Sequence, residues 1–359
     1  MVDRVVIMAG GTGGHVFPAL AVAQELAQRG VVVTWIGTQK GLEADVVPKA
    51  GIPIDWVTIS GLRGNGALGW LMAPFRLIRA LMQARRIIAE RKPGAVLGMG
   101  GFVTGPGGVA AWTMGVPLLV HEQNSIPGMT NRWLTRIATR VMVAFPRAFA
   151  AEVKAIHTGN PLREDILRVA PPAERFVGRT GPVRVLVIGG SLGAAALNET
   201  VPAAIKRFAP GRRPEVWHQT GKRNLESAQG HYSAAGVDAR VVAFIDNMAD
   251  AYAWADLVIC RAGALTISEL AAVGVGAILV PYPHAVDDHQ TTNAHYLSEA
   301  GAAMLIQQSA LSGDSLYPVL AQLCGDRSRL LAMAQAARKL ALPESTRQVA
   351  NICLEAAHV

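Results

Sequence analysis

Short apolar segments alternate with longer amphipathic segments along most of the chain. Residues 2–8 are predicted to form a buried strand around the apolar run 5–8, and residues 16–29 repeat apolar positions with the period of a helix that ends before Gly30. The apolar positions of that helix are Val16, Leu20, Ala23 and Ala27. Further strands are predicted at 31–36, 54–59, 95–97 and 117–120, and further helices at 41–50 and 70–90. Apolar strands that alternate with helices are typical of a doubly wound α/β protein with a parallel sheet.

The pattern breaks at residues 159–182, where prolines, glycines and mixed charges predict an interdomain linker. After this segment the alternation starts again, with predicted strands at 183–188, 215–219, 240–245, 256–260 and 277–280 and a helix from 194. We therefore expect two Rossmann-like domains, residues 1–160 and 161–342. Proteins of this build bind ligands at the carboxyl ends of their strands, so we expect the site in a deep cleft between the domains.

Composition narrows the class of protein. A chain of 359 residues exceeds one ordinary core, and although 51% of it is hydrophobic, no run reaches the roughly 18 apolar residues that a membrane span requires. The N-terminus does not resemble a signal peptide, and the three cysteines lie far apart, so we expect a reducing cytoplasm. The net charge of +8 is compatible with an anionic partner, but scattered arginines and 6% aromatic residues do not favour nucleic acid.

A glycine-rich loop, residues 10–15 (GGTGGH), follows the first predicted strand. Glycines let the backbone approach a ligand, and the following helix offers free N–H groups to an anion. The dinucleotide fingerprint is absent, because Val16 replaces its third glycine and the second strand ends in Gly37-Thr38 without an acid. Glycine-rich segments recur at 98–108 and 189–193, and none has the sequence of an ATP-binding P-loop. A tight turn without a ligand stays open as the alternative.

Three further segments carry candidate chemistry. The segment 261–269 (RAGALTISE) predicts a helix start that presents backbone donors to a diphosphate, or a capping box between Thr266 and Glu269. The segment 121–124 (HEQN) places four polar residues at the carboxyl end of a strand, where we expect them to meet a ligand. The segment 284–290 (HAVDDHQ) could form a metal cluster, but it lacks an Asp-x-Asp pattern, and solvated helix caps are the alternative.

Taken together and in order, these segments resemble the MurG family of bacterial glycosyltransferases, which add N-acetylglucosamine to lipid I. The resemblance rests on the segments GGTGGHVFPALAVA (10–23), SGLRG (60–64), VLGMGGFVTGPGG (96–108), HEQN, GNPLR (159–163), GGSLGA (189–194), RAGALTISE and PHAVDDHQTTNA (283–294). It implies the two-domain GT-B fold. It also implies that a C-terminal helix at 343–359, centred on 345–357, packs back on the first domain.

The resemblance also implies a donor, UDP-N-acetylglucosamine, held mainly by the second domain and by Arg163. Uracil would meet the backbone of Ile245, the ribose would meet Glu269, and the sugar hydroxyls would meet Gln290. The remaining implied contacts are Ser191, Ala264, Leu265, Thr266, Ile267 and Ser268 from the second domain, mainly for the diphosphate, and Thr12, Gly13, Gly14 and Asn124 from the first. His289 receives no role.

The reaction must stabilise a leaving diphosphate and remove a proton from the attacking hydroxyl. Helix dipoles and Arg163 can stabilise the leaving diphosphate without a metal, and no cofactor is expected. We expect His15, in a loop at a helix N-terminus, to act as a neutral base toward the 4-hydroxyl of the muramoyl sugar, which gives inversion to a β-linkage. The alternative is that His15 hydrogen-bonds an acceptor phosphate, with His121 or Glu122 as the reserve base.

A polyprenyl acceptor requires contact with a membrane. The apolar run at 67–75 leads into a helix with arginines beside its apolar face, as in helices that dock on anionic lipid. The predicted contacts are Trp70, Leu71, Phe75, Ile78 and Arg79. We therefore expect a peripheral protein on the cytoplasmic face of the inner membrane, with other cell-wall synthesis proteins as partners. A core-facing helix with a solvated basic side is the alternative.

Other functions stay open at this point. A UDP-N-acetylglucosamine 2-epimerase would share the fold and the donor but would need its own acid and base and no lipid. Another lipid glycosyltransferase, such as a galactolipid synthase, would share the membrane contact. A scaffold that only binds nucleotide sugar would keep Glu269 and tolerate the loss of His15.

Overall fold

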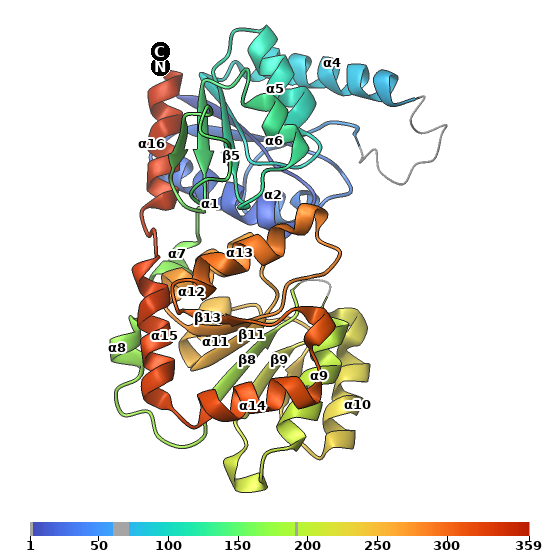
Figure 1. Cartoon of the computed structure of the whole chain (residues 1–359). Helices are drawn as coiled ribbons and strands as arrows, with labels where there is room; N and C mark the ends of the chain where they lie inside the picture. The colour runs from blue at the N-terminus through green and yellow to red at the C-terminus, as the bar shows by residue number, and fades with distance from the viewer. Residues whose placement is uncertain (1–2, 60–71, 191–192, 359) are drawn as a thin grey trace. The chain divides into compact units, whose positions relative to one another are not determined.

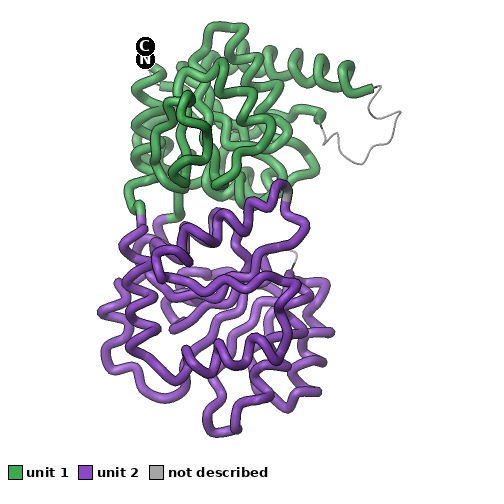
Figure 2. The backbone as a smooth tube through the Cα atoms, viewed as in Figure 1, with its two compact units in different colours: residues 1–163, 342–359 green, residues 164–341 purple. Residues whose placement is uncertain are grey.

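The computed structural model describes residues 3–59, 72–190 and 193–358 of the chain. The chain forms two compact units, one of residues 1–163 with 342–359 and the other of residues 164–341 (Figure 2). The predicted residues Trp70, Leu71 and Ser191, and the segment 60–64, lie outside the described residues.

The first unit contains a parallel sheet of seven strands in the order β3-β2-β1-β4-β5-β6-β7 (Figure 1). Its strands are β1 (Arg4–Met8), β2 (Val32–Gly37), β3 (Ile54–Trp56), β4 (Ala95–Gly98), β5 (Leu118–Glu122), β6 (Arg140–Val143) and β7 (Ala155–His157). Its helices are α1 (Gly13–Gln28), α2 (Glu43–Lys49), α4 (Ala73–Arg91), α5 (Thr104–Thr113), α6 (Met129–Leu134) and α16 (Ser345–Ala357).

Both faces of this sheet are buried, which explains why its strands are apolar without alternation. Val5 and Ile7 of β1 belong to a core with α1 and α16, whereas Val6 and Met8 belong to a core with α4 and α5 on the opposite face (Figure 1). Cys353 of α16 is fully buried in the first of these cores, so the C-terminal helix is part of this unit.

The second unit contains six parallel strands in the order β10-β9-β8-β11-β12-β13. Its strands are β8 (Arg184–Ile188), β9 (Glu215–Gln219), β10 (Arg240–Val242), β11 (Leu257–Cys260), β12 (Gly276–Leu279) and β13 (Ala303–Leu305). Its α-helices are α7 (Glu164–Leu167), α8 (Pro172–Arg175), α9 (Ala195–Lys206), α10 (Leu225–Ala235), α11 (Met248–Trp254), α12 (Ala264–Val273), α13 (His289–Ser298), α14 (Gly313–Cys324) and α15 (Arg327–Lys339). Helices α9, α14 and α15 contribute to the core on one face of this sheet.

The predicted fold class is confirmed, and the differences concern boundaries. Helix α1 begins at Gly13 rather than at residue 16, and its buried face includes Leu26 in place of the exposed Ala27. The short strands β6, β7 and β13 were not predicted, since three or four residues are too few for a periodicity to show.

The segment 159–182 is not an open linker, because it contains α7 and α8. The guanidinium of Arg175 donates to the carbonyl oxygens of Ala170, Val273 and Gly274, at 2.7, 2.7 and 2.6 Å. The bonds to Val273 and Gly274 satisfy carbonyl groups at the C-terminal end of α12, which a helix leaves without intrahelical partners. Residues 164–182 are therefore built into the second unit, whereas 159–163 belong to the first.

The buried carboxylate of Glu43 holds the first glycine-rich loop. Its oxygens accept hydrogen bonds from the backbone N–H of Gly11 and of Thr38, each at 2.9 Å, and from the Thr38 hydroxyl at 2.7 Å. A Cβ at Gly10 would lie 2.6 Å from Glu43 Oε1, so a glycine is required where the loop passes the carboxylate.

We predict that Glu43→Ala destabilises the first unit by about 2–4 kcal/mol, because two partly buried N–H groups and the Thr38 hydroxyl lose their acceptor. Calorimetry should show the transition of this unit lowered by roughly 5–15 °C. Asp45→Ala on the same helix is the matched control, since Asp45 forms an exposed pair with Lys49 and its loss should change stability by less than about 0.5 kcal/mol. An unchanged transition for Glu43→Ala would show that the carboxylate does not hold the loop.

Candidate functional site

The strand order of each sheet reverses at one position, which is where α/β proteins bind ligands. In the first unit the reversal lies between β1 and β4, whose last residues Met8 and Gly98 are paired. The loops that follow these strands are in close contact, since a Cβ at Gly101 would lie 2.4 Å from the carbonyl oxygen of Gly10. Gly101 has a φ of +87°, so this approach requires glycine for two reasons. Helices α1 and α5 begin beside this point.

The sequence placed His15 in the loop before α1, but the structure places it in the first turn of that helix. The helix begins earlier because Gly13 and Gly14 take helical conformations after Thr12, the N-cap residue. The imidazole is half-buried, and its Nδ1 lies 2.9 Å from Oε1 of Gln123. The ring lies against Gly100, where a Cβ would come within 2.5 Å of Nδ1.

His121 and Glu122 are the last residues of β5, and both are buried, with exposed fractions of 0% and 1%. Glu122 accepts hydrogen bonds from the backbone N–H groups of Asn124 and Gly128 and from Nδ2 of Asn131, at 2.9, 3.1 and 2.8 Å. A carboxylate with three donors shapes the loop and is poorly placed to take a proton. The expectation that 121–124 presents four polar side chains to a ligand is therefore wrong for His121, Glu122 and Gln123, because their side chains are buried, whereas Asn124 is partly exposed.

In the second unit the reversal lies between β8 and β11, and α12 follows β11 after the short segment 261–263. Gly263 is the N-cap residue of α12, and no side chain caps it, so the predicted capping box of Thr266 and Glu269 is not formed. Glu269 instead accepts a hydrogen bond at 2.9 Å from the hydroxyl of Tyr252, which the sequence did not single out. Two of the predicted diphosphate contacts, Ala264 and Ile267, have buried side chains, so these two residues can meet a ligand only through their backbones.

The other predicted donor residues lie on nearby elements of the same unit or at its border. Ile245 is buried in the loop after β10, which ends at Val242 rather than at residue 245. Gln290 is in the first turn of α13, and its Oε1 accepts from the backbone N–H of Tyr282 at 2.9 Å, which leaves its Nε2 for other contacts. Arg163 is half-buried at the last position before α7.

Within the described residues, no group of three or more histidine, cysteine, aspartate or glutamate side chains could hold a metal ion. The segment 284–290 therefore forms no such cluster there. Asp287 and Asp288 are exposed and have positive φ values of 53° and 50°.

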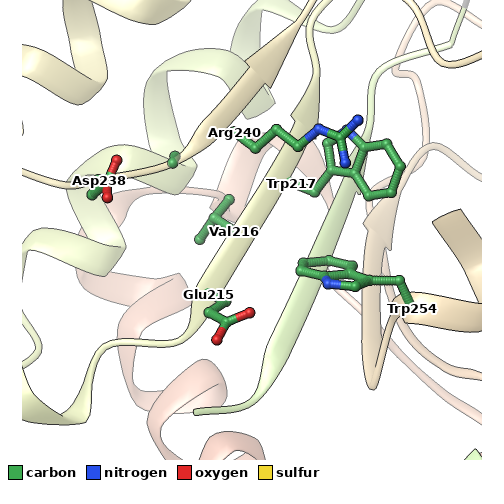
Figure 3. A pocket seen from close by; sticks show the side chains of 7 residues that line it. Glu215, Val216, Trp217, Asp238, Arg240 and Trp254 are labelled. Carbon is green, nitrogen blue, oxygen red and sulfur yellow. The ribbon is translucent and has the colours of Figure 1, made fainter.

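A cavity of about 420 Å³ lies in the second unit, lined by Glu215, Val216, Trp217, Asp238, Ala239, Arg240 and Trp254 (Figure 3). The guanidinium carbon of Arg240 lies 3.7 Å from the centre of the Trp217 ring. Glu215 and Arg240 are the first residues of β9 and β10, so this cavity is at the amino ends of the strands. It is therefore at the opposite edge of the sheet from the loops described above.

Helix α4 has one buried face and one exposed apolar face. Ala80, Ala84 and Ile88 pack in the core, whereas Phe75 and Ile78 are 66% and 56% exposed. Exposed arginines accompany this apolar face, with Arg79 and Arg86 on it, so the predicted amphipathic helix is present. Two exposed tryptophans of the same unit, Trp112 on α5 and Trp133 on α6, were not predicted as surface residues. No helix among the described residues is long and apolar enough to span a bilayer.

Comparisons with known proteins match both units. The family model for the glycosyltransferase family 28 N-terminal domain matches residues 5–143, and the model for its C-terminal domain matches residues 184–349. The UDP-N-acetylglucosamine–N-acetylmuramyl-(pentapeptide) pyrophosphoryl-undecaprenol N-acetylglucosamine transferase of Marinobacter nauticus is 54% identical over 355 residues, which cover 99% of this chain and 98% of that protein.

Solved structures agree with this relationship. A crystal structure of Acinetobacter baumannii MurG has a TM-score of 0.85 and 42% identity, covering 98% of this chain and 99% of that one. A UDP-N-acetylglucosamine 2-epimerase has a TM-score of 0.66 at 16% identity, covering 97% and 95%, which shows a shared fold alone. The chain therefore belongs to glycosyltransferase family 28 and, within it, to the MurG family of glycosyltransferases.

Proposed function

We propose that this protein transfers N-acetylglucosamine from UDP-N-acetylglucosamine to the 4-hydroxyl of the muramoyl sugar of lipid I, with inversion at the anomeric carbon. The observation that carries the proposal is 54% identity, over nearly the whole length of both chains, to a transferase named for this reaction. The glycine-rich loops and helix starts at the strand-order reversals of both units support it, since these are sites for phosphate groups.

The second unit binds the donor. The N-terminal end of α12, where no side chain caps the helix, faces the diphosphate, and Glu269 accepts hydrogen bonds from the ribose hydroxyls. Ile245 contacts uracil through its backbone, Gln290 contacts the sugar, and Ser191 contacts the diphosphate. Burial of Glu269 and its bond to the Tyr252 hydroxyl support this role, because they fix the carboxylate before a ligand arrives.

The first unit binds the acceptor and supplies the base. The starts of α1 and α5 face the negative charge of the acceptor pyrophosphate, with α1 contributing Thr12, Gly13 and Gly14. The partly exposed Asn124, from the loop after β5, contacts the acceptor as well. His15 removes the proton from the attacking hydroxyl as the bond from the sugar to the diphosphate breaks. His15 is preferred over Glu122 because the oxygens of Glu122 already accept three hydrogen bonds.

The reaction proceeds without a metal ion. Helix N-termini and Arg163 stabilise the charge that develops on the leaving UDP. The exposed apolar face of α4 and its arginines bring the protein to the anionic surface that holds the acceptor, so the protein is peripheral to the membrane.

We predict disaccharide product, together with released UDP, from purified protein, UDP-N-acetylglucosamine and a short-chain lipid I analogue in the presence of EDTA. His15→Ala should lower kcat by about 10²- to 10⁴-fold, because the general base is lost, while the KM of the donor stays within twofold. His231→Ala, on the surface of α10, is the control and should retain the wild-type rate.

The other outcomes identify the alternatives. N-acetylmannosamine formed without acceptor would indicate the epimerase. Tight donor binding with no turnover would indicate a scaffold, and turnover that stops in EDTA would contradict the metal-independent mechanism.

We predict that Tyr252→Phe raises the KM of the donor about 3- to 10-fold with a smaller effect on the KM of the acceptor, because Glu269 loses the hydroxyl that fixes it. Tyr317→Phe on α14 removes a hydroxyl elsewhere in the same unit and should leave both constants unchanged. Equal donor KM values for the two variants would argue against ribose binding by a Tyr252-oriented Glu269.

We predict that replacing Phe75 and Ile78 together by serine weakens binding to phosphatidylglycerol vesicles at least about tenfold, because both side chains lose burial in the bilayer interface. A sedimentation assay measures this binding, and kcat with a water-soluble acceptor should not change. Val177→Ser, an exposed apolar residue of the second unit, is the control. Wild-type vesicle binding by the double variant would exclude α4 as the contact.

A further inference from the structure

We propose that Gln123 and His121 are positioning residues that fix the tautomer of His15, so that Nδ1 carries its proton and Nε2 carries the lone pair that takes the substrate proton. The inference rests on the proposed role of His15 as the base. It concerns three side chains of the first unit that are linked in a row, His15 to Gln123 to His121.

The amide of Gln123 is oriented by two groups of His121. Its Nε2 lies 3.2 Å from the backbone carbonyl oxygen of His121 and 3.1 Å from Nδ1 of the same residue. A carbonyl oxygen can only accept a hydrogen bond, so the NH₂ end of the amide must face it. The other end, Oε1, therefore faces His15 Nδ1 at 2.9 Å.

The ring of His121 independently requires the same orientation of the Gln123 amide. Its Nε2 lies 2.9 Å from the carbonyl oxygen of Gly159, so this nitrogen carries a proton. Complete burial lowers the pKa of His121 to about 4, and the ring is neutral at pH 7. A neutral imidazole protonated at Nε2 has its lone pair at Nδ1, which accepts from the Gln123 amide.

The consequence for His15 follows from the chemistry of the amide oxygen. Oε1 of Gln123 has no proton to give, so His15 Nδ1 must be the donor across the 2.9 Å contact. In the neutral ring, Nε2 is then the only basic nitrogen. Gly100 makes this position available, because a Cβ there would lie 2.5 Å from Nδ1 and would displace the imidazole.

The arrangement is rigid, which suits a positioning role. Gln123 is 1% exposed, and its backbone carbonyl accepts from Nδ2 of Asn160 at 3.2 Å. The row thus joins α1, the end of β5 and the segment after β7. Without it, His15 could turn about its side-chain bonds and present either nitrogen in either protonation state.

The experiment combines ¹⁵N NMR of histidine-labelled enzyme with kinetics of Gln123 variants. In the wild type we expect His15, assigned with His15→Gln, to be protonated at Nδ1, and His121 at Nε2. In Gln123→Leu we expect kcat to fall about 10- to 100-fold with donor and acceptor KM within about twofold, and His15 to become a mixture of tautomers. Gln123→Glu keeps an acceptor for His15 Nδ1 and should recover part of the lost kcat.

Two results would overturn the inference. A wild-type His15 protonated at Nε2 would do so, and this spectrum decides the matter even if Gln123→Leu fails to fold. A folded Gln123→Leu enzyme with kcat within twofold of wild type would also do so. Failure of the proposed function gives a different pattern. Either the wild type would not transfer N-acetylglucosamine, or His15→Ala would still transfer it. The NMR spectrum reports the tautomer of His15 in both cases.

Discussion

The reversal of strand order between β1 and β4, repeated between β8 and β11, is the constraint on which both units depend. Crossovers between parallel strands are right-handed, so helices that follow the two central strands lie on opposite faces of the sheet. The chain therefore leaves those two strands toward opposite faces of the sheet, and this reversal is where ligands bind in α/β proteins. In the first unit, successive side chains of β1 point to opposite faces, so Val5 and Val6 lie in different cores, and the candidate site lies at the reversal of strand order.

Buried carboxylates hold two loops at the carboxyl ends of the strands of the first unit. Glu43 binds the loop after β1, and Glu122 binds the loop after β5, each through several hydrogen bonds to nearby donors. Glycine is required where backbone passes close to backbone or to a carboxylate, as at Gly10 and Gly101. The glycines give the loops their close approach, and the carboxylates select one conformation from the many that glycine allows.

The sequence pattern predicted those features of the fold that nearby residues determine. The central strands of both sheets were predicted from runs of apolar residues, and the loops after them from their glycines. The fold class followed from the alternation of these strands with helices. The pattern could not predict that His15 lies inside α1, because Gly13 and Gly14 have weak helix preference and tertiary contacts decide the start. It also could not predict the bond between His15 and Gln123, which are 108 positions apart, or the bond between Tyr252 and Glu269.

The number of hydrogen bonds at each polar group separates structural residues from chemical ones. Glu43 and Glu122 each accept from three or more donors, so protonating either would break bonds that hold a loop. His121 is buried and neutral, with both nitrogens engaged. His15 is different, because it is half-buried and its bond to Gln123 engages Nδ1 alone. Among these four titratable side chains at the carboxyl edge of the sheet, His15 can gain a proton without disrupting the loops that hold it.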